Sequence, residues 1–302
     1  PLSRPHRPKQ LLDLSGQGVL LWQTFDRLGS LVSSDQSWMV VGKSHAQGCM
    51  AAVPNIEEKR VLIEPCARNT AAAIGLAAVH LVNANPDSIM VILPADHHVR
   101  DSSAFCEAIN LAASVAEGST IVTLGIQPSR PETGYGYIEC GEPRKSNGVF
   151  DVSAFKEKPE SVVAEQYLSS GNYYWNAGVF ITRADTILGQ LKQHQEELYA
   201  GLMELAEFIG KSDYHEQLER IYSSLPSISI DYAVMENADD IAVVPVECGW
   251  SDVGSLATLD GVVPADEHEN LVLGKAVTID TQGCTLLAEH DHLIATIGLK
   301  DM

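Results

Sequence analysis

Two aspartates stand beyond the ends of apolar runs, where a carboxylate can hold a metal ion. Asp96 follows the apolar residues 89–93, and Asp252 follows the apolar residues 241–246. In open α/β sheets, ligands bind just beyond the carboxyl ends of the strands, so we expect both side chains in one crevice. Mg²⁺ takes one or two protein carboxylates and completes its shell with water and phosphate oxygens. Taken alone, Asp96 fits a turn or a helix cap equally well.

Two lysines beside prolines could bind phosphate groups as point charges. Lys9 follows Pro8 and Lys158 precedes Pro159, so a proline restricts the backbone next to each ammonium group. The two lysines are therefore candidates for binding anionic substrates. Taken by itself, Lys158 is more typical of an ordinary surface lysine.

Four further residues suit the recognition of a sugar. Glu157 and Asn176 offer acceptors and donors for hydroxyl groups, and Gly134 and Gly136 permit a ligand to approach the backbone closely. Each also has an ordinary structural explanation. The two glycines fit a hairpin turn, and Asn176 is a common turn residue.

Alternating strands and helices must position these residues. Up to residue 125, short apolar runs alternate with helical stretches, which is typical of a doubly wound α/β sheet. Strands are expected at 38–41, 60–63, 89–93 and 120–125, and helices at 19–28, 70–82 and 103–116. Further strands are expected at 149–156, 179–182 and 241–246, with helical periodicity between residues 184 and 222. We expect one α/β domain over residues 1–262.

The last forty residues change to short β runs, at 271–273, 276–279, 285–287 and 293–297. We therefore expect residues 263–302 to be the beginning of a small β appendage, cut off in mid-pattern at Met302. The chain would then be one large domain followed by part of a second, smaller unit.

Composition excludes several classes of partner. The chain has 20 basic and 40 acidic residues and a formal charge of -20, so it repels nucleic acid and anionic lipid. Its 6 cysteines form no C-x-x-C pair, which indicates buried thiols in a reducing compartment. The most apolar helical stretch, 70–82, is too short to cross a bilayer, and the first ten residues lack the apolar core of a signal peptide. We expect a cytoplasmic protein without a membrane or a polymeric nucleic acid as partner.

Eight motifs in order along the chain resemble those of bacterial mannose-1-phosphate guanylyltransferases. They are PLSRPHRPKQ (1–10), EPCARNT (64–70), LPADH (93–97), ETGYGYI (132–138), FKEKP (155–159), WNAG (175–178), SIDYAVME (229–236) and WSDVGS (250–255). The resemblance implies a Rossmann-like nucleotidyltransferase fold with a mixed, mainly parallel sheet. It also implies transfer of GMP from GTP to α-D-mannose 1-phosphate, giving GDP-mannose for polysaccharide biosynthesis and releasing pyrophosphate.

The resemblance also assigns roles to individual residues. Asp96 and Asp252 would hold Mg²⁺, and with Lys9 and Lys158 they would form the catalytic set. The nucleotide would be bound by Lys9, Glu64, Arg68, Asn69, Thr70 and Asp96. The sugar phosphate would be bound by Gly134, Tyr135, Gly136, Glu157, Lys158 and Asn176.

The resemblance leaves alternatives open. In the family, a glycine-rich phosphate loop precedes the segment that matches Pro1, so we expect the sequence to be a fragment at both ends. Another sugar-1-phosphate nucleotidyltransferase is one alternative, and a catalytically silent paralogue that binds GDP-mannose is another. The intact Asp96, Asp252 and Lys158 argue against the silent paralogue. The oligomeric state stays open, a homodimer being one alternative.

Overall fold

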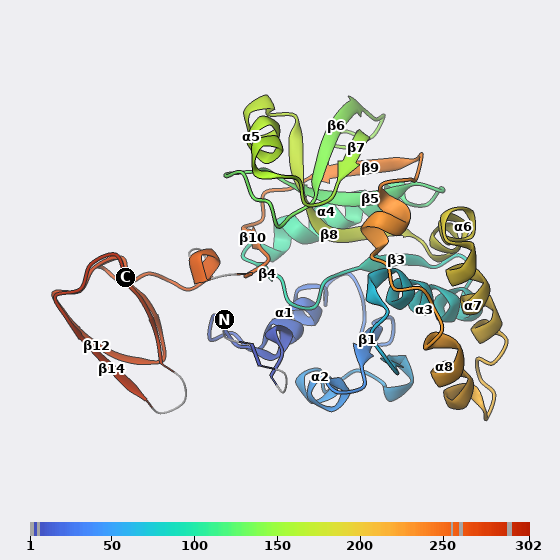
Figure 1. Ribbon diagram of the computed structural model, residues 1–302, viewed down its shortest axis with the longest axis horizontal. Helices are drawn as coiled ribbons and strands as arrows, with labels where there is room; N and C mark the ends of the chain where they lie inside the picture. Colours follow the sequence, from blue (N-terminus) through green and yellow to red (C-terminus); the bar gives the residue numbers. More distant parts are fainter. Residues whose placement is uncertain (1–2, 5–6, 255, 260–261, 289–291) are drawn as a thin grey trace.

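A six-stranded sheet lies at the centre of the molecule (Figure 1). The computed structural model describes the chain except residues 1–2, 5–6, 255, 260–261 and 289–291, so parts of the motifs 1–10 and 250–255 lie outside the described residues. The strand order is β3-β8-β5-β9-β7-β6. The strands are β3 (Ile89–Ile92), β5 (Ile121–Ile126), β6 (Tyr137–Pro143), β7 (Phe150–Lys156), β8 (Tyr173–Arg183) and β9 (Ile241–Pro245).

The sheet is mixed, as expected, but the expectation of mainly parallel pairing is wrong for its neighbouring strands. Among the described strands of this sheet, only β5 and β9 pair in parallel, whereas β8 is antiparallel to β3, β5 and β6, and β7 is antiparallel to β6 and β9. The strands β3, β5, β6 and β9 nevertheless share one direction. Strand β8 is inserted between β3 and β5, and an apolar run does not reveal the direction of its neighbour.

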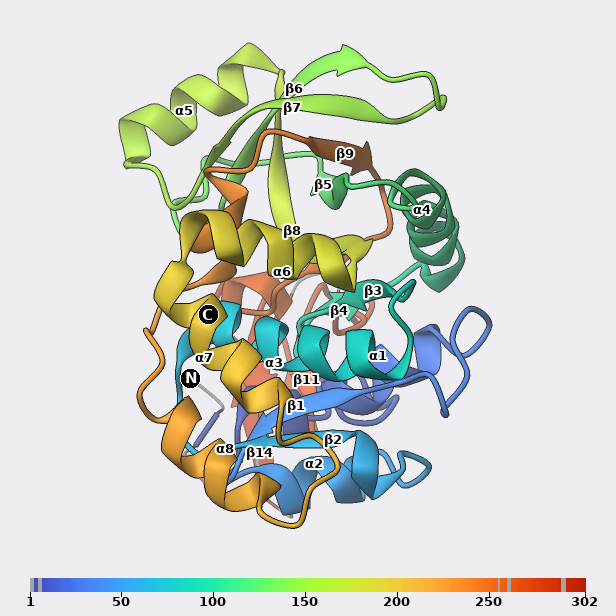
Figure 2. The same cartoon turned by 90° about the vertical axis from the view of Figure 1, so that its right-hand side faces the viewer.

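Helices cover both faces of the sheet (Figure 2). Four of them pack together on one face: α3 (Asn69–Ala84), α6 (Ala184–His194), α7 (Glu196–Ala206) and α8 (Tyr214–Tyr222). Helix α4 (Ser102–Val115) packs on the other face. The residues of β9 alternate between the two cores, with Ile241 and Val243 in the first and Ala242 and Val244 in the second. This alternation is what a strand buried on both faces requires. Helix α5 (Ser161–Ser170) lies beside β6 and β8.

The amino-terminal part forms a smaller layer next to α3. Strands β1 (Met39–Gly42) and β2 (Val61–Glu64) pair in parallel. Helices α1 (Leu20–Arg27) and α2 (Ala46–Ala52) pack against β1 through a separate apolar cluster. The short helices η1 (Lys9–Leu11) and η2 (Glu58–Arg60) complete this layer. Strand β2 runs directly into the connection that opens α3, which places the motif 64–70 between them.

Two short strands bring distant parts of the chain together. Strand β4 (His98–Val99) pairs antiparallel with β10 (Trp250–Ser251), so that Ser251 lies opposite His98. Asp96 comes just before β4 and Asp252 just after β10. Antiparallel pairing places the start of one strand beside the end of the other, so the two aspartates lie at the same end of this pair. The π-helical turn η3 (Asp231–Met235) and the turn η4 (Leu256–Leu259) precede and follow this region.

Residues 263–302 form the expected short β elements. Strand β11 (Leu271–Leu273) pairs in parallel with β13 (Thr285–Leu287), and β12 (Lys275–Ile279) pairs in parallel with β14 (Leu293–Ile297). In Figure 1 they lie at the left, on the opposite side of the molecule from α6 to α8. They contact the rest of the chain through an apolar cluster that includes Leu12 and Leu20.

The helices and the cysteines bear on the expectations about membrane spans and buried thiols. Within the described residues, every helix is too short or too polar to cross a bilayer. All 6 cysteines are free, and four of them are buried: Cys49, Cys106, Cys248 and Cys284.

The contact between α3 and α7 yields a stability prediction. Leu202 is fully buried, and a Cβ on Gly75 would lie 2.3 Å from its Cδ1, so α3 leaves room for this side chain. We expect Leu202→Ala to lower the free energy of unfolding by about 2–5 kcal/mol, because it leaves a cavity. The matched control, Met203→Ala, alters a neighbour that is 39% exposed and should cost less than about 1 kcal/mol. Urea denaturation of both variants measures the difference, and similar losses would contradict the prediction.

Candidate functional site

Lys9 joins the two predicted metal-binding aspartates. Its Nζ lies 3.0 Å from Asp96 Oδ2 and also donates a hydrogen bond to the backbone oxygen of Asp252. The three residues come from η1, the β3–β4 connection and the end of β10. The structure therefore brings together three of the four residues expected to form the catalytic set.

Buried contacts hold the Asp96 loop in place. Trp250 Nε1 donates to His97 Nδ1 at 3.2 Å, and Arg27 donates to the backbone oxygen of His97 at 3.1 Å. Burial lowers the pKa of His97 to about 4, so its ring is neutral at pH 7. An indole nitrogen can only donate, so His97 carries its hydrogen on Nε2, which lies 3.9 Å from Asp96 Oδ1.

Tyr135 was expected to bind the sugar phosphate. In the structure its side chain also contacts Asp252. Its hydroxyl donates to Asp252 Oδ1 at 2.5 Å. Its ring meets Trp175 and Trp250 edge-on, with centroids 5.2 and 5.4 Å away. Burial and the neighbouring Asp252 carboxylate raise the pKa of Tyr135, so the hydroxyl stays protonated and remains a donor.

The donors around Lys9 are of the kind that a divalent cation takes. Asp96 and Asp252 carry carboxylates, which hard cations prefer, and Lys9 contacts the Asp96 carboxylate and the backbone oxygen of Asp252. Within the part of the chain that the structure describes, no three His, Cys, Asp or Glu side chains form a metal cluster. Water and substrate oxygens would therefore have to complete the shell of a bound ion.

Glu157 and Lys158 form an ion pair where β7 ends. Lys158 Nζ donates to Glu157 Oε1 at 2.7 Å. The Lys158 side chain is 60% exposed and that of Glu157 only 9%. Neighbouring residues of a strand point to opposite faces, but β7 ends at Lys156 and Lys158 has a left-handed φ of +46°. This change of backbone conformation lets both side chains meet.

The backbone of Gly136 packs so closely against this ion pair that a side chain would not fit there. A Cβ at residue 136 would lie 2.5 Å from Glu157 Oε2 and 3.2 Å from Asn176 Cβ. The backbone of Asn176 donates to the oxygen of Gly136 at 2.8 Å, which fixes their separation. The structure thus brings Gly136, Glu157, Lys158 and Asn176 together. Gly134 lies near Glu132, whose Oε1 accepts its N–H at 3.0 Å.

Asp231 also belongs to this group, although the sequence reasoning gave it no role. Asn176 Nδ2 donates to Asp231 Oδ1 at 3.1 Å. Burial, with the charge of Glu157 as a further cause, raises the pKa of Asp231 from 3.8 to about 6. A sequence signal was available, because Asp231 is a carboxylate within a stretch that contains the apolar residues Ile230, Ala233 and Val234.

The residues expected to bind the nucleotide base form a separate group between β2 and α3. Tyr222 donates to Glu64 Oε1 at 2.5 Å, and burial raises the pKa of Glu64. Arg68 donates to the backbone oxygen of Ser223, and Asn69 begins α3 with a φ of +65°. Thr70 Oγ1 accepts the backbone N–H of Ile230 at 2.8 Å. Within the described residues, none of these hydrogen bonds reaches Lys9 or Asp96.

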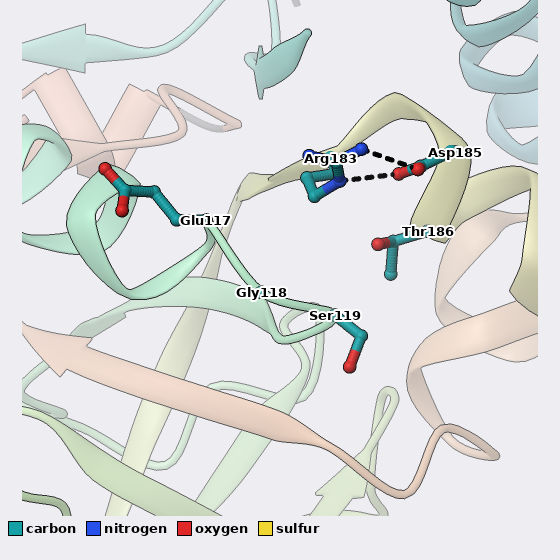
Figure 3. A pocket seen from close by; sticks show the side chains of 6 residues that line it. All are labelled: Glu117, Gly118, Ser119, Arg183, Asp185 and Thr186. Carbon is teal, nitrogen blue, oxygen red and sulfur yellow. Dashed lines mark hydrogen bonds and ion pairs between the residues drawn. The ribbon is translucent and has the colours of Figure 1, made fainter. Parts of the chain in front are cut away.

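A hollow elsewhere contains none of the predicted residues. It measures about 290 Å³ and is lined by Glu117, Gly118, Ser119, Arg183, Asp185 and Thr186 (Figure 3). Arg183 is already paired with Asp185 at 2.7 Å and Asp87 at 3.2 Å. Its charge is thus neutralised, and the hollow has no feature in common with the predicted site.

The raised pKa of Asp231 has a consequence for stability. The folded protein holds this proton more tightly than the unfolded chain does, so the contribution is present at low pH and is lost as pH rises from about 4 to about 6. We expect Asp231→Asn to abolish this loss, which amounts to roughly 2 kcal/mol. Urea unfolding of both proteins between pH 4.5 and pH 8 measures the difference. An identical pH dependence would contradict the assignment.

Comparisons with known proteins show the family to which the chain belongs. The family model of nucleotidyl transferases matches residues 1–269. The alginate biosynthesis protein AlgA of Pseudomonas syringae and mannose-1-phosphate guanylyltransferase 2 of Escherichia coli O157:H7 are 38% and 37% identical to the whole chain. The chain spans 63% and 64% of these relatives, less than two thirds of their length.

A solved structure confirms the fold. The crystal structure of mannose-1-phosphate geranyltransferase from Thermus thermophilus matches with a TM-score of 0.87 and 37% identity. The match covers 99% of this chain and 86% of that one. The expected α/β nucleotidyltransferase fold is therefore confirmed, and the chain belongs to the nucleotidyl transferase family.

Proposed function

We propose that the chain carries the active site of a mannose-1-phosphate guanylyltransferase. This enzyme transfers GMP from GTP to α-D-mannose 1-phosphate, giving GDP-mannose and pyrophosphate. One observation carries the proposal. Tyr135 connects the pair of aspartates around Lys9 with the residues proposed to bind the sugar, which lie around Lys158. Its hydroxyl donates to Asp252, while its backbone oxygen accepts the N–H of Lys158 at 3.2 Å. A sugar phosphate held between the two groups would have its hydroxyls at one end and its phosphate near the cation.

The reaction depends on neutralising the negative charges of the two substrates rather than on a general base. A phosphate oxygen of the sugar phosphate forms a bond to the α-phosphorus of GTP, and the bond from that phosphorus to the pyrophosphate oxygen breaks. The attacking oxygen is already ionised, so no side chain has to remove a proton. Both substrates are anions, and the protein must hold them together against their repulsion.

The residues present can meet this requirement. The Lys158 side chain is exposed and pairs with Glu157, so its ammonium group can turn from Glu157 and bind the phosphate of the sugar phosphate. Lys9 can contact the phosphates of GTP. The family generally uses a divalent metal, and we propose Mg²⁺ held by Asp96 and Asp252, which would neutralise phosphate charge.

The remaining assignments follow the same division. Glu157, Asn176 and the backbone of Gly134 and Gly136 would contact the sugar. Glu64, Arg68, Asn69 and Thr70 would lie near the guanine and ribose. We further propose residues 1–262 as the catalytic domain and 263–302 as part of a β appendage. Free thiols support a cytoplasmic location.

A substrate panel tests the proposal. Pyrophosphate release is measured with GTP, ATP, UTP and CTP, each combined with mannose 1-phosphate, glucose 1-phosphate and galactose 1-phosphate. The proposal expects GTP with mannose 1-phosphate to give the highest kcat/KM. A higher value for another pair would assign the site to a different sugar nucleotide, and binding of GDP-mannose without any turnover would indicate a silent paralogue.

Removing either metal-binding carboxylate should abolish most of the turnover. We expect Asp96→Asn and Asp252→Asn each to lower kcat at least about 100-fold, equivalent to about 2.7 kcal/mol of lost charge stabilisation. The control Asp87→Asn removes a carboxylate that is 82% exposed and remote from the site. Turnover is measured over a series of Mg²⁺ concentrations, and near-normal rates for Asp96→Asn would rule out the two-carboxylate site.

Lys158→Ala should weaken the binding of mannose 1-phosphate much more than that of GTP. We expect the KM for mannose 1-phosphate to rise about tenfold or more while the KM for GTP changes little, because the ammonium group lies on the sugar side. Lys156→Ala, an exposed lysine two residues earlier, is the matched control. A comparable rise in the KM for GTP would place Lys158 at the nucleotide instead.

A further inference from the structure

The geometry points to Asp231 as the positioning residue that orients the Asn176 amide toward the sugar hydroxyls. This inference rests on the proposed function, since it concerns the sugar side of the same site. Asp231 touches Asn176 rather than any reacting atom. Its role would be to hold the amide nitrogen of Asn176 and to favour, together with the backbone N–H of Gly178, the orientation in which that nitrogen faces the substrate.

One fixed donor determines the position of the amide oxygen. Asn176 Oδ1 accepts the backbone N–H of Gly178 at 2.9 Å, whereas the Thr123 hydroxyl, 3.4 Å away, also lies 3.1 Å from the backbone oxygen of Val179 and has only one hydrogen to donate. A backbone N–H can only donate, so the atom facing Gly178 must be the oxygen. The amide nitrogen then faces Asp231, whose carboxylate accepts one of its two hydrogens at 3.1 Å. In the flipped amide, oxygen would face the carboxylate and N–H would face the N–H of Gly178, so both contacts would become repulsive.

The amide nitrogen of Asn176 lies beside Gly136, close to the Glu157 carboxylate. A Cβ at residue 136 would lie 3.5 Å from Asn176 Nδ2 and 2.5 Å from Glu157 Oε2. An N–H donor and a carboxylate acceptor therefore crowd the side of Gly136 where a side chain would stand, so that only glycine fits there. A hydroxyl group can accept from the first and donate to the second, whereas a flipped amide would present two acceptors. By holding the amide in this orientation, Asp231 makes a hydroxyl the group that can pair with both the amide N–H and the Glu157 carboxylate.

Asp231 is itself held firmly. The preceding residue, Ile230, donates its backbone N–H to Thr70 Oγ1 at 2.8 Å. Ala233, Val234 and Met235, which follow in η3, are buried in the main core. The carboxylate therefore has a fixed position from which to hold the amide.

The charges around Asp231 indicate that this carboxylate serves the function of the protein rather than its stability. Glu157 raises its pKa and Lys158 and Ser229 lower it, while Glu236 at the end of η3 accepts the N–H of Glu157 at 3.2 Å. Burial and the like charge of Glu157 make the ionised form unfavourable. A residue that lowers stability at neutral pH is typical of a site kept for function.

Three variants test the inference. Asp231→Ala removes the acceptor and should raise the KM for mannose 1-phosphate about tenfold, with the KM for GTP nearly unchanged. Asp231→Asn retains an oxygen that can accept from Asn176, so it should recover most of the affinity. The control, Asp239→Asn, alters an exposed carboxylate after the same turn and should match the unaltered protein.

Two further measurements separate positioning from a structural role. The unfolding midpoint of Asp231→Asn at pH 8 should equal or exceed that of the unaltered protein. The ratio of its kcat/KM to that of the unaltered protein should rise as pH falls through about 6, where the natural carboxylate loses its charge. The titration of the substrate's own phosphate cancels in this ratio.

The outcomes decide between the explanations. Equal losses for GTP and the sugar phosphate, or a lowered midpoint in Asp231→Asn, would assign Asp231 a structural role and overturn the inference. If the unaltered protein prefers another sugar 1-phosphate, the proposed function fails, and the variants are compared with that substrate instead.

Discussion

The contact of one ammonium group with two acidic strand ends organises this site. Lys9 binds the Asp96 carboxylate and the Asp252 backbone, which come from segments more than 150 residues apart in the β4–β10 pair. In a chain with a formal charge of -20, carboxylates gathered at one edge repel each other unless a cation lies between them. The lysine supplies that charge from a short helix outside the sheet.

Local signals in the sequence predicted where the functional side chains stand along the chain. The apolar run before Asp96 forms β3, and the strand before Glu157 and Lys158 ends at Lys156, as their spacing indicated. The short β runs after residue 263 also form as expected. Each of these signals depends on a few neighbouring residues, and proline or a change in hydrophobicity marks the end.

Contacts between distant residues could not be predicted in the same way. Strand β8 lies between β3 and β5, and Ile89 is 36% exposed because β3 is at the end of the sheet order rather than in its middle. Tyr135 meets Asp252 across 117 residues, and Asn176 meets Asp231 across 55. The family resemblance assigned Tyr135 to the sugar-phosphate group and gave Asp231 no role, and no local pattern could reveal their partners, which lie far away in the sequence.

The short segment at residues 230 and 231 connects two parts of the site mechanically. Ile230 is held by Thr70, at the start of α3, and Asp231 holds Asn176, on β8. Because the two residues are adjacent, a displacement of one hydrogen bond is transmitted to the other through a single peptide unit. If ligands on the two sides shift this peptide unit, thermodynamic linkage requires each to change the affinity of the other by the same factor. The segment is thus the shortest covalent connection between the Thr70 and Asn176 contacts.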